Sequence, residues 1–113
     1  MNPGKLPSFD LETLLNQIKN AESWKKESCS SIVLRNGKPL RVTLIAMHAS
    51  AIIPPHSVDS PISVQVVEGL ITFKADEKSA SLEKGQMLTL EAGISHSLEA
   101  PEESAFLLTR VTY

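Results

Sequence analysis

Two histidines, His56 and His96, are the residues of this chain whose type and setting best suit chemistry. They lie in short stretches rich in proline, glycine and serine, "PPHSVDSPI" and "EAGISHS". Imidazole binds divalent metals and also transfers protons near neutral pH. Two such groups facing one cavity would therefore suit either a metal site or a proton-transfer site.

Other side chains that could complete such a site are few. Catalytic metal sites generally use three protein ligands and a water. Beyond the two histidines, further ligands would have to come from water or from neighbouring oxygens, namely Ser57, Asp59 and Glu91. Neither His48 nor the single cysteine, Cys29, has a role assigned by any pattern. One cysteine excludes a disulfide within the chain and favours a reducing compartment.

A short amphipathic helix is predicted ahead of the region that carries the histidines. Four apolar residues recur at the spacing of one helical face: Leu11, Leu14, Leu15 and Ile18. Ser8 or Asp10 could cap its first turn. We expect the helix to pack on its own domain or on a dimer mate, with partner binding as the alternative. Residues 1–28 are assigned to this helical segment, and residues 29–113 to a single β domain.

From Ser30 onward, short runs rich in β-branched residues alternate with turn signals. The runs are "SIVL", "LRVTLIAMH", "ISVQVV", "LITFKA", "SASL", "MLTL", "SHSLEA" and "AFLLTRVTY". Between the first two, Asn36-Gly37 is typical of a two-residue hairpin turn. Closely spaced strands of this kind indicate an all-β sandwich or barrel.

The spacing of glycines and histidines in the β region resembles that of the cupin superfamily. Counted back from Gly69, His56 occupies the place of the first histidine in the first cupin motif, and Ser50 that of its opening glycine. The resemblance implies an all-β jelly-roll barrel, or double-stranded β-helix, of the small single-domain RmlC-like type, with a short N-terminal helix.

The second cupin motif is matched in the same way. Counted forward from Gly85, Gly93 and His96 occupy motif positions, and Glu91 stands in place of a proline. Together the two halves cover residues from about 41 to 109. The resemblance implies that His56 and His96 lie inside one barrel.

Two departures from the first motif affect the site directly. Val58 stands where the motif has its second histidine, and Ile62 where it has glutamate. If Ile62 faces inward, strand alternation turns Gln65 away from the site. The resemblance therefore implies a degenerate site, in which His56 and His96 could hold a divalent metal such as zinc, nickel, iron or manganese. The predicted cavity wall is formed by Met47, Val58, Ile62 and Val64.

Three roles stay open for the two histidines: residual pocket groups satisfied by backbone or water, hydrogen-bonding groups for a small molecule, or metal ligands. The main hypothesis is a small cupin-like barrel that binds an unidentified small molecule, with a degenerate metal site. The alternative is a metal-dependent cupin enzyme, dioxygenase-like or isomerase-like, that uses His56 and His96.

Composition and surface pattern bear on partners. A formal net charge of −2 gives no attraction toward nucleic acid. The sequence shows neither a signal-peptide pattern nor an apolar segment long enough for a membrane, so we expect a cytoplasmic protein. A homodimer is expected because small cupins usually pair, and because Val67 and the apolar run "FLLTRVTY" need covering.

Overall fold

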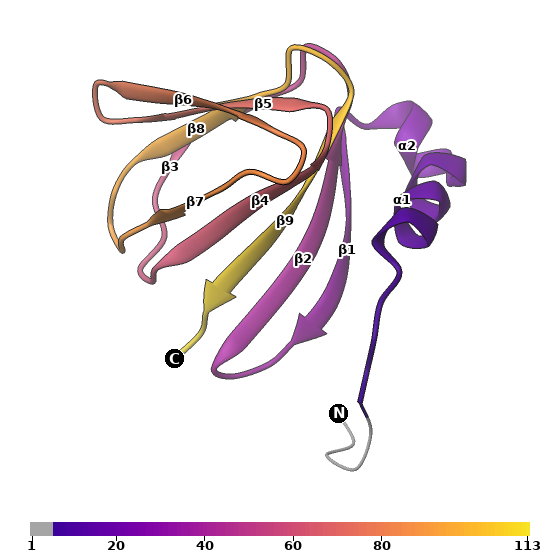
Figure 1. Cartoon of the computed structure of the whole chain (residues 1–113), viewed down its shortest axis with the longest axis horizontal. Helices are drawn as coiled ribbons and strands as arrows, with labels where there is room; N and C mark the ends of the chain where they lie inside the picture. Colours follow the sequence, from indigo (N-terminus) through magenta and orange to yellow (C-terminus); the bar gives the residue numbers. More distant parts are fainter. Residues whose placement is uncertain (1–5) are drawn as a thin grey trace.

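Two antiparallel β-sheets lie face to face in the structure, and two helices cover the outer side of one of them (Figure 1). The computed structural model describes residues 6–113. The five-stranded sheet has the order β1 (Cys29–Asn36), β2 (Leu40–Met47), β9 (Ser104–Val111), β4 (Ile62–Glu68) and β7 (Met87–Leu90). The four-stranded sheet has the order β3 (Ile52–His56), β8 (His96–Glu99), β5 (Leu70–Ala75) and β6 (Lys78–Glu83).

The chain passes repeatedly from one sheet to the other, as it does in a jelly roll. After β1 and β2, it enters the four-stranded sheet with β3, returns with β4, and crosses again before β5, β7, β8 and β9. All strand runs predicted from the sequence form strands. The prediction of an all-β jelly-roll domain is therefore confirmed.

Two local features differ from the sequence predictions. The stretch that contains Pro54 and Pro55 is absent from the predicted strand runs but forms β3; the strand lies at the edge of its sheet, where a missing backbone N–H is tolerated. The hairpin predicted between the first two strands forms, but its turn is longer than the two residues Asn36-Gly37. Asn36 ends β1, and the connection to β2 is the three-residue stretch 37–39, with a cis peptide bond between Lys38 and Pro39.

The main core fills the space between the two sheets. Strand alternation produces it: along β4, Ile62, Val64 and Val66 are buried, whereas Gln65 between them is exposed. From the opposite sheet, Ile71 and Phe73 of β5 are buried against them. This arrangement leaves the inward-facing positions of both sheets to define any internal site.

The helices form a second core on the outer face of the five-stranded sheet. α1 (Leu11–Asn20) begins at Asp10, whose side chain accepts a hydrogen bond from the Thr13 backbone N–H at 3.2 Å. α2 (Glu22–Lys26) follows after one residue and was not predicted. The buried residues of this second core are Leu15, Ile18, Trp24, Leu44, Ala46 and Ala105. The predicted helix therefore packs on its own domain.

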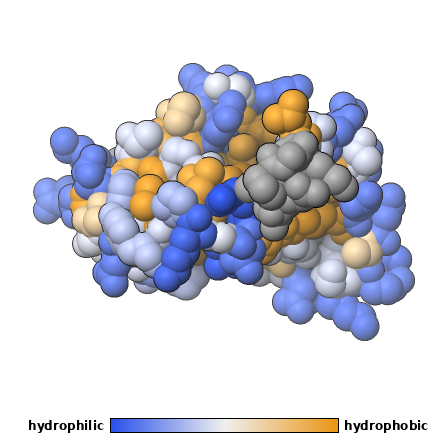
Figure 2. Space-filling model, turned by 90° about the horizontal axis from the view of Figure 1, so that it is seen from below, coloured by the Kyte–Doolittle hydropathy of each residue, from blue (hydrophilic) through white to orange (hydrophobic). Residues whose placement is uncertain are grey.

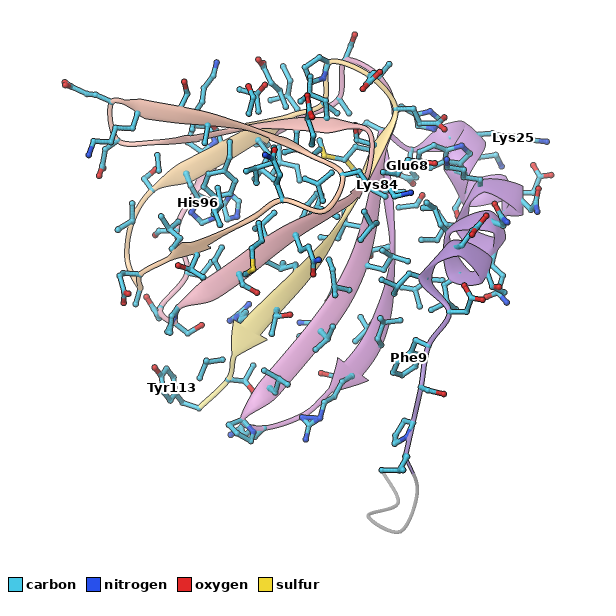
Figure 3. The ribbon with its side chains drawn as sticks, in the orientation of Figure 1. Phe9, Lys25, Glu68, Lys84, His96 and Tyr113 are labelled. Carbon is cyan, nitrogen blue, oxygen red and sulfur yellow. The ribbon has the colours of Figure 1, made fainter. Side chains whose placement is uncertain are left out.

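The helices cover part of the apolar surface that was expected to lie in a dimer interface. Val67, which was expected to need a partner, lies against the helical core of its own chain. Lys19 of α1 adds ion pairs to Glu68 at 2.7 Å and Glu103 at 2.8 Å. Burial disfavours the charged ammonium, but hydrogen bonds to the two glutamates and their charges outweigh it, so the pKa of Lys19 is raised. Figure 3 shows Glu68 on the side of the barrel that faces the helices.

None of the helices within residues 6–113 has the length and apolar character needed to cross a membrane.

Candidate functional site

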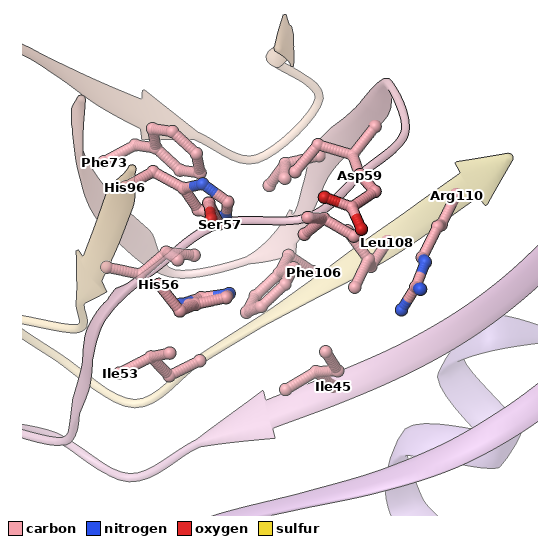
Figure 4. A pocket seen from close by; sticks show the side chains of 14 residues that line it. Ile45, Ile53, His56, Ser57, Asp59, Phe73, His96, Phe106, Leu108 and Arg110 are labelled. Carbon is pink, nitrogen blue, oxygen red and sulfur yellow. The ribbon is translucent and has the colours of Figure 1, made fainter. Parts of the chain in front are cut away.

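A pocket of about 370 Å³ lies between the two sheets. Its apolar walls come from both sheets, and its polar groups are His56, Ser57, Asp59, His96 and Arg110 (Figure 4). The apolar lining residues are Ile45, Ile53, Val58, Ile62, Val64, Phe73, Leu98, Phe106 and Leu108. A volume of this size is at the lower end of the range for small-molecule sites.

His56 and His96 line this pocket together. They are register partners on the adjacent strands β3 and β8, and their ring centroids lie 4.3 Å apart. The two histidines are therefore neighbours within one sheet and do not lie on two opposing sheets. His96 is 4% exposed and lies between the sheets (Figure 3), whereas His56 is exposed at the rim.

A β-bulge in β3 is what turns His56 into the pocket. Ile53 pairs with Leu98 and His56 with His96, so β3 advances three residues while β8 advances two. Without the extra residue, alternation would place Ile53 and His56 on opposite faces of the sheet. The bulge therefore allows both side chains to line the same pocket.

Backbone carbonyls fix the orientation of both imidazoles. His56 Nδ1 lies 3.0 Å from the Pro54 carbonyl oxygen, and His96 Nδ1 lies 2.9 Å from that of Ile94. Because a carbonyl oxygen only accepts, each Nδ1 carries the proton and donates it. In the neutral rings, Nε2 then keeps its lone pair for a ligand. The Phe73 ring, stacked on His96 at a centroid distance of 5.3 Å, further holds the buried imidazole.

The residues that replace the missing motif ligands also line the pocket. Val58, Ile62 and Val64 do so as predicted for the cavity wall, but Met47 does not. Met47 is fully buried in the main core and is not among the lining residues. The pocket wall is thus aliphatic at the two positions where the motif has metal ligands.

This donor set does not fit a metal site with three protein ligands. Within residues 6–113, no group of three or more His, Cys, Asp or Glu side chains is arranged to hold a metal ion. Asp59 lines the pocket, but it lies at the end away from the histidines (Figure 4). Glu91, the other acidic candidate, is not among the lining residues.

Arg110 is the polar pocket residue that the sequence interpretation missed. It follows Phe106 and Leu108 at intervals of two along β9, and all three line the pocket. The same alternation that assigned the faces of β4 could have found it. Its guanidinium lies at the opposite end of the pocket from the two histidines (Figure 4).

His48 has a structural position outside the pocket. Its ring stacks on Trp24 of α2 with centroids 3.5 Å apart, and its Nε2 lies 2.6 Å from the Trp24 carbonyl oxygen. It thereby joins the end of β2 to the helical core.

A larger and shallower hollow of about 790 Å³ lies on the outer face of the five-stranded sheet. Phe9, Leu11, Leu34, Val42 and Leu107 are among its lining residues. Among residues 6–113, no histidine or carboxylate lines it, and its charged side chains are Arg35 and Lys38.

No known family model matches the sequence, and no curated protein sequence matches it either. Solved structures do. A conserved protein of unknown function from Streptococcus pyogenes is 23% identical, with a TM-score of 0.77 over 100% of this chain and 91% of that one. An RmlC-like cupin from Shewanella frigidimarina is 17% identical, with a TM-score of 0.72 over 76% of this chain and 78% of that one.

A mutant of salicylate 1,2-dioxygenase from Pseudoaminobacter salicylatoxidans gives a TM-score of 0.78 at 16% identity. It matches 96% of this chain, which spans 39% of that longer protein. These similarities show that the chain is a small domain with the cupin fold, as the two half motifs predicted.

Proposed function

We propose that this cupin-fold domain binds a small molecule in the pocket between its sheets, with His56 and His96 as hydrogen-bonding groups. The main support for this proposal is that the two imidazoles lie side by side, with ring centroids 4.3 Å apart, in a pocket with aliphatic walls. Both rings are held through Nδ1, so their Nε2 atoms are the groups left to contact a ligand. Few, well-placed polar groups in an apolar concave site are typical of small-molecule recognition.

The lining residues favour binding over metal chemistry. Val58 and Ile62 take the two positions where the cupin motif has ligands, and neither side chain can donate a lone pair. Two imidazoles alone leave most of the coordination sphere of zinc, nickel, iron or manganese to water. Such a site would hold metal weakly.

A metal-dependent enzyme is the second candidate, and one observation favours it. Ligating histidines usually donate their other ring N–H to a carbonyl or carboxylate, and both His56 and His96 do this. The cupin-fold neighbours include a dioxygenase, although the likeness is one of fold. Near-stoichiometric metal in untagged protein would support this candidate over the first.

The proposed binding function is tested by blocking the pocket. A fragment library is screened by ligand-detected NMR against the wild-type protein and against Val58→Trp, which fills the pocket from a half-buried position. Met87→Trp, at an exposed position outside the pocket, is the matched control. We expect fragments that bind the wild type and the control but not the blocked variant. Equal binding to the blocked variant, or no binding to the wild type, would refute the proposal.

A further inference from the structure

Two of the three arginines in the chain are neighbours on the inner face of the five-stranded sheet. Arg41 of β2 and Arg110 of β9 are register partners, so their side chains project from the same face. Arg110 also pairs with Ile62 of β4, whose side chain is buried in the main core. Like charges directly opposite each other in a sheet are destabilising. This pair therefore needs a compensating group.

No described residue forms an ion pair with either arginine. The Nε atoms of both Arg41 and Arg110 are buried and lack a hydrogen-bond partner within residues 6–113. Ion pairs within 4.0 Å in the same part of the chain all involve lysines. Asp59 lines the pocket with Arg110 but makes no ion pair with it. Buried donors without acceptors are costly, so the two guanidiniums are arranged for an acceptor from outside the chain.

Both arginines border space that a ligand can reach. Arg110 and Leu108 line the main pocket and also an adjoining hollow of about 210 Å³, whose other lining residues are Arg41 and Thr43. In Figure 4, Arg110 lies at one end of the pocket and the histidines at the other, with Phe106 between them. Seen from below, strongly hydrophilic residues lie beside hydrophobic ones near the centre of the visible surface (Figure 2).

We propose that Arg110 and Arg41 form an oxyanion subsite, and that the ligand is a small, mainly apolar molecule carrying a carboxylate or a phosphate group. The proposal rests on the pocket being a binding site. Guanidinium groups bind either oxyanion through paired charge-assisted hydrogen bonds. The apolar middle of the pocket would contact the body of the ligand, and the imidazoles its opposite end.

Three matched probes test the charge requirement: benzoate, phenyl phosphate and benzamide. Each is titrated against ¹⁵N-labelled wild-type protein by NMR, with Arg110→Gln, Arg110→Lys and Arg41→Gln as variants. Arg35→Gln is the control. Arg35 is the third arginine and lines the outer hollow, not the main pocket or the adjoining hollow, and it donates a hydrogen bond to the Leu40 carbonyl.

We expect an oxyanion probe to bind the wild type and Arg35→Gln at least about tenfold more tightly than benzamide does. Arg110→Gln should abolish this preference, Arg41→Gln should reduce it, and Arg110→Lys should retain part of it. Which of benzoate and phenyl phosphate binds better identifies the oxyanion. Without ligand, Arg41→Gln should melt at the same temperature as the wild type or higher, because it removes the like-charge pair.

Other results overturn the proposal. If benzamide binds as well as both oxyanions, and Val58→Trp blocks all three, the oxyanion subsite is wrong while the pocket still binds small molecules. If no probe binds although library fragments do, the oxyanion subsite is again wrong. If neither probes nor fragments bind, the proposed binding function fails with it. A clear loss of ligand-free stability in Arg41→Gln would show that the arginine pair is structural.

Discussion

His56 and His96 are register partners across β3 and β8, and each donates its Nδ1 proton to a carbonyl two residues earlier in the chain. Because both Nδ1 atoms are used in these hydrogen bonds, the two Nε2 lone pairs stay free at one end of an apolar pocket. Val58 and Ile62, which stand where the cupin motif has its other ligands, line that same pocket. The pocket can therefore be altered toward metal binding by changing those positions.

Restoring the missing ligands should restore metal affinity. We expect Val58→His with Ile62→Glu to bind zinc or nickel at least about tenfold more tightly than the parent, since each added ligand contributes about 1.4 kcal/mol or more. Ile62 is buried, so the metal-free variant should lose roughly 1–3 kcal/mol of stability. Calorimetric titration and thermal melts in chelator measure both effects.

The control for this variant is Gln65→Glu, which adds a carboxylate on the outward side of the same strand and should leave metal affinity unchanged. Tight binding of one metal per chain by the parent would show that the ligand loss does not weaken the site. A folded double variant that binds no better would show that the two positions do not complete the site.

Gly69 should be the least replaceable glycine of the barrel. Its φ is +77°, and an added Cβ would collide with the Glu103 carbonyl and the buried Ser104 hydroxyl, which accepts a hydrogen bond from the Leu70 N–H at 2.9 Å. We expect Gly69→Ala to lower the free energy of unfolding by about 2–4 kcal/mol.

Gly85→Ala is the matched control for the collision. Gly85 has a similar φ of +88°, but an added Cβ meets nothing within 4 Å. It should cost about 1 kcal/mol, from the backbone conformation alone. Equal losses for the two variants in urea unfolding would contradict the assigned collision at Gly69.

Lys19 should stabilise the contact between the helices and the barrel through its charge. We expect Lys19→Met to lose about 1 kcal/mol, because Glu68 and Glu103 then lose their shared cation. Lys25→Met, which removes an exposed pair to Glu22 at 3.8 Å, should have little effect. Chemical unfolding at neutral pH compares the two variants.

The pH dependence of this difference follows from the raised pKa of Lys19. A group with a raised folded pKa contributes fully below its unfolded value, about 10.5 here, and its contribution disappears as the pH rises through the folded pKa. The difference in unfolding free energy between the wild type and Lys19→Met should therefore be constant from neutral pH to about pH 10 and shrink above it. If the stability difference persists well above the pKa of Lys19 in the folded protein, the lysine acts through packing and not through its charge.

A homodimer stays a prediction, now based on the sheet edge rather than on Val67. β1 is an edge strand of the five-stranded sheet, and Val33 on it is 40% exposed. Unpaired strand edges favour pairing with a second copy. We expect light scattering to give twice the 12.3 kDa chain mass, and Val33→Lys to lower it. A single-chain mass for the wild type across micromolar concentrations would contradict the prediction.

The sequence predicted most of the fold because its strands alternate clearly and its turns carry glycines at Gly69, Gly85 and Gly93, all with positive φ in the structure. It did not predict β3, since two prolines there suggest a loop. The bulge that these prolines occupy, which turns His56 inward, depends on pairing with β8 and leaves no local signal. Arg110 was detectable by alternation along β9, but its pairing with Arg41 required the sheet order.

The most direct test of small-molecule binding is a crystal structure of the wild-type protein with the best-binding fragment. We expect electron density in the inner pocket, in contact with Nε2 of His56 or His96 and, for an oxyanion, with the guanidinium of Arg110. Density found instead in the outer hollow beside Phe9 and Leu34, with the inner pocket holding only water, would contradict it.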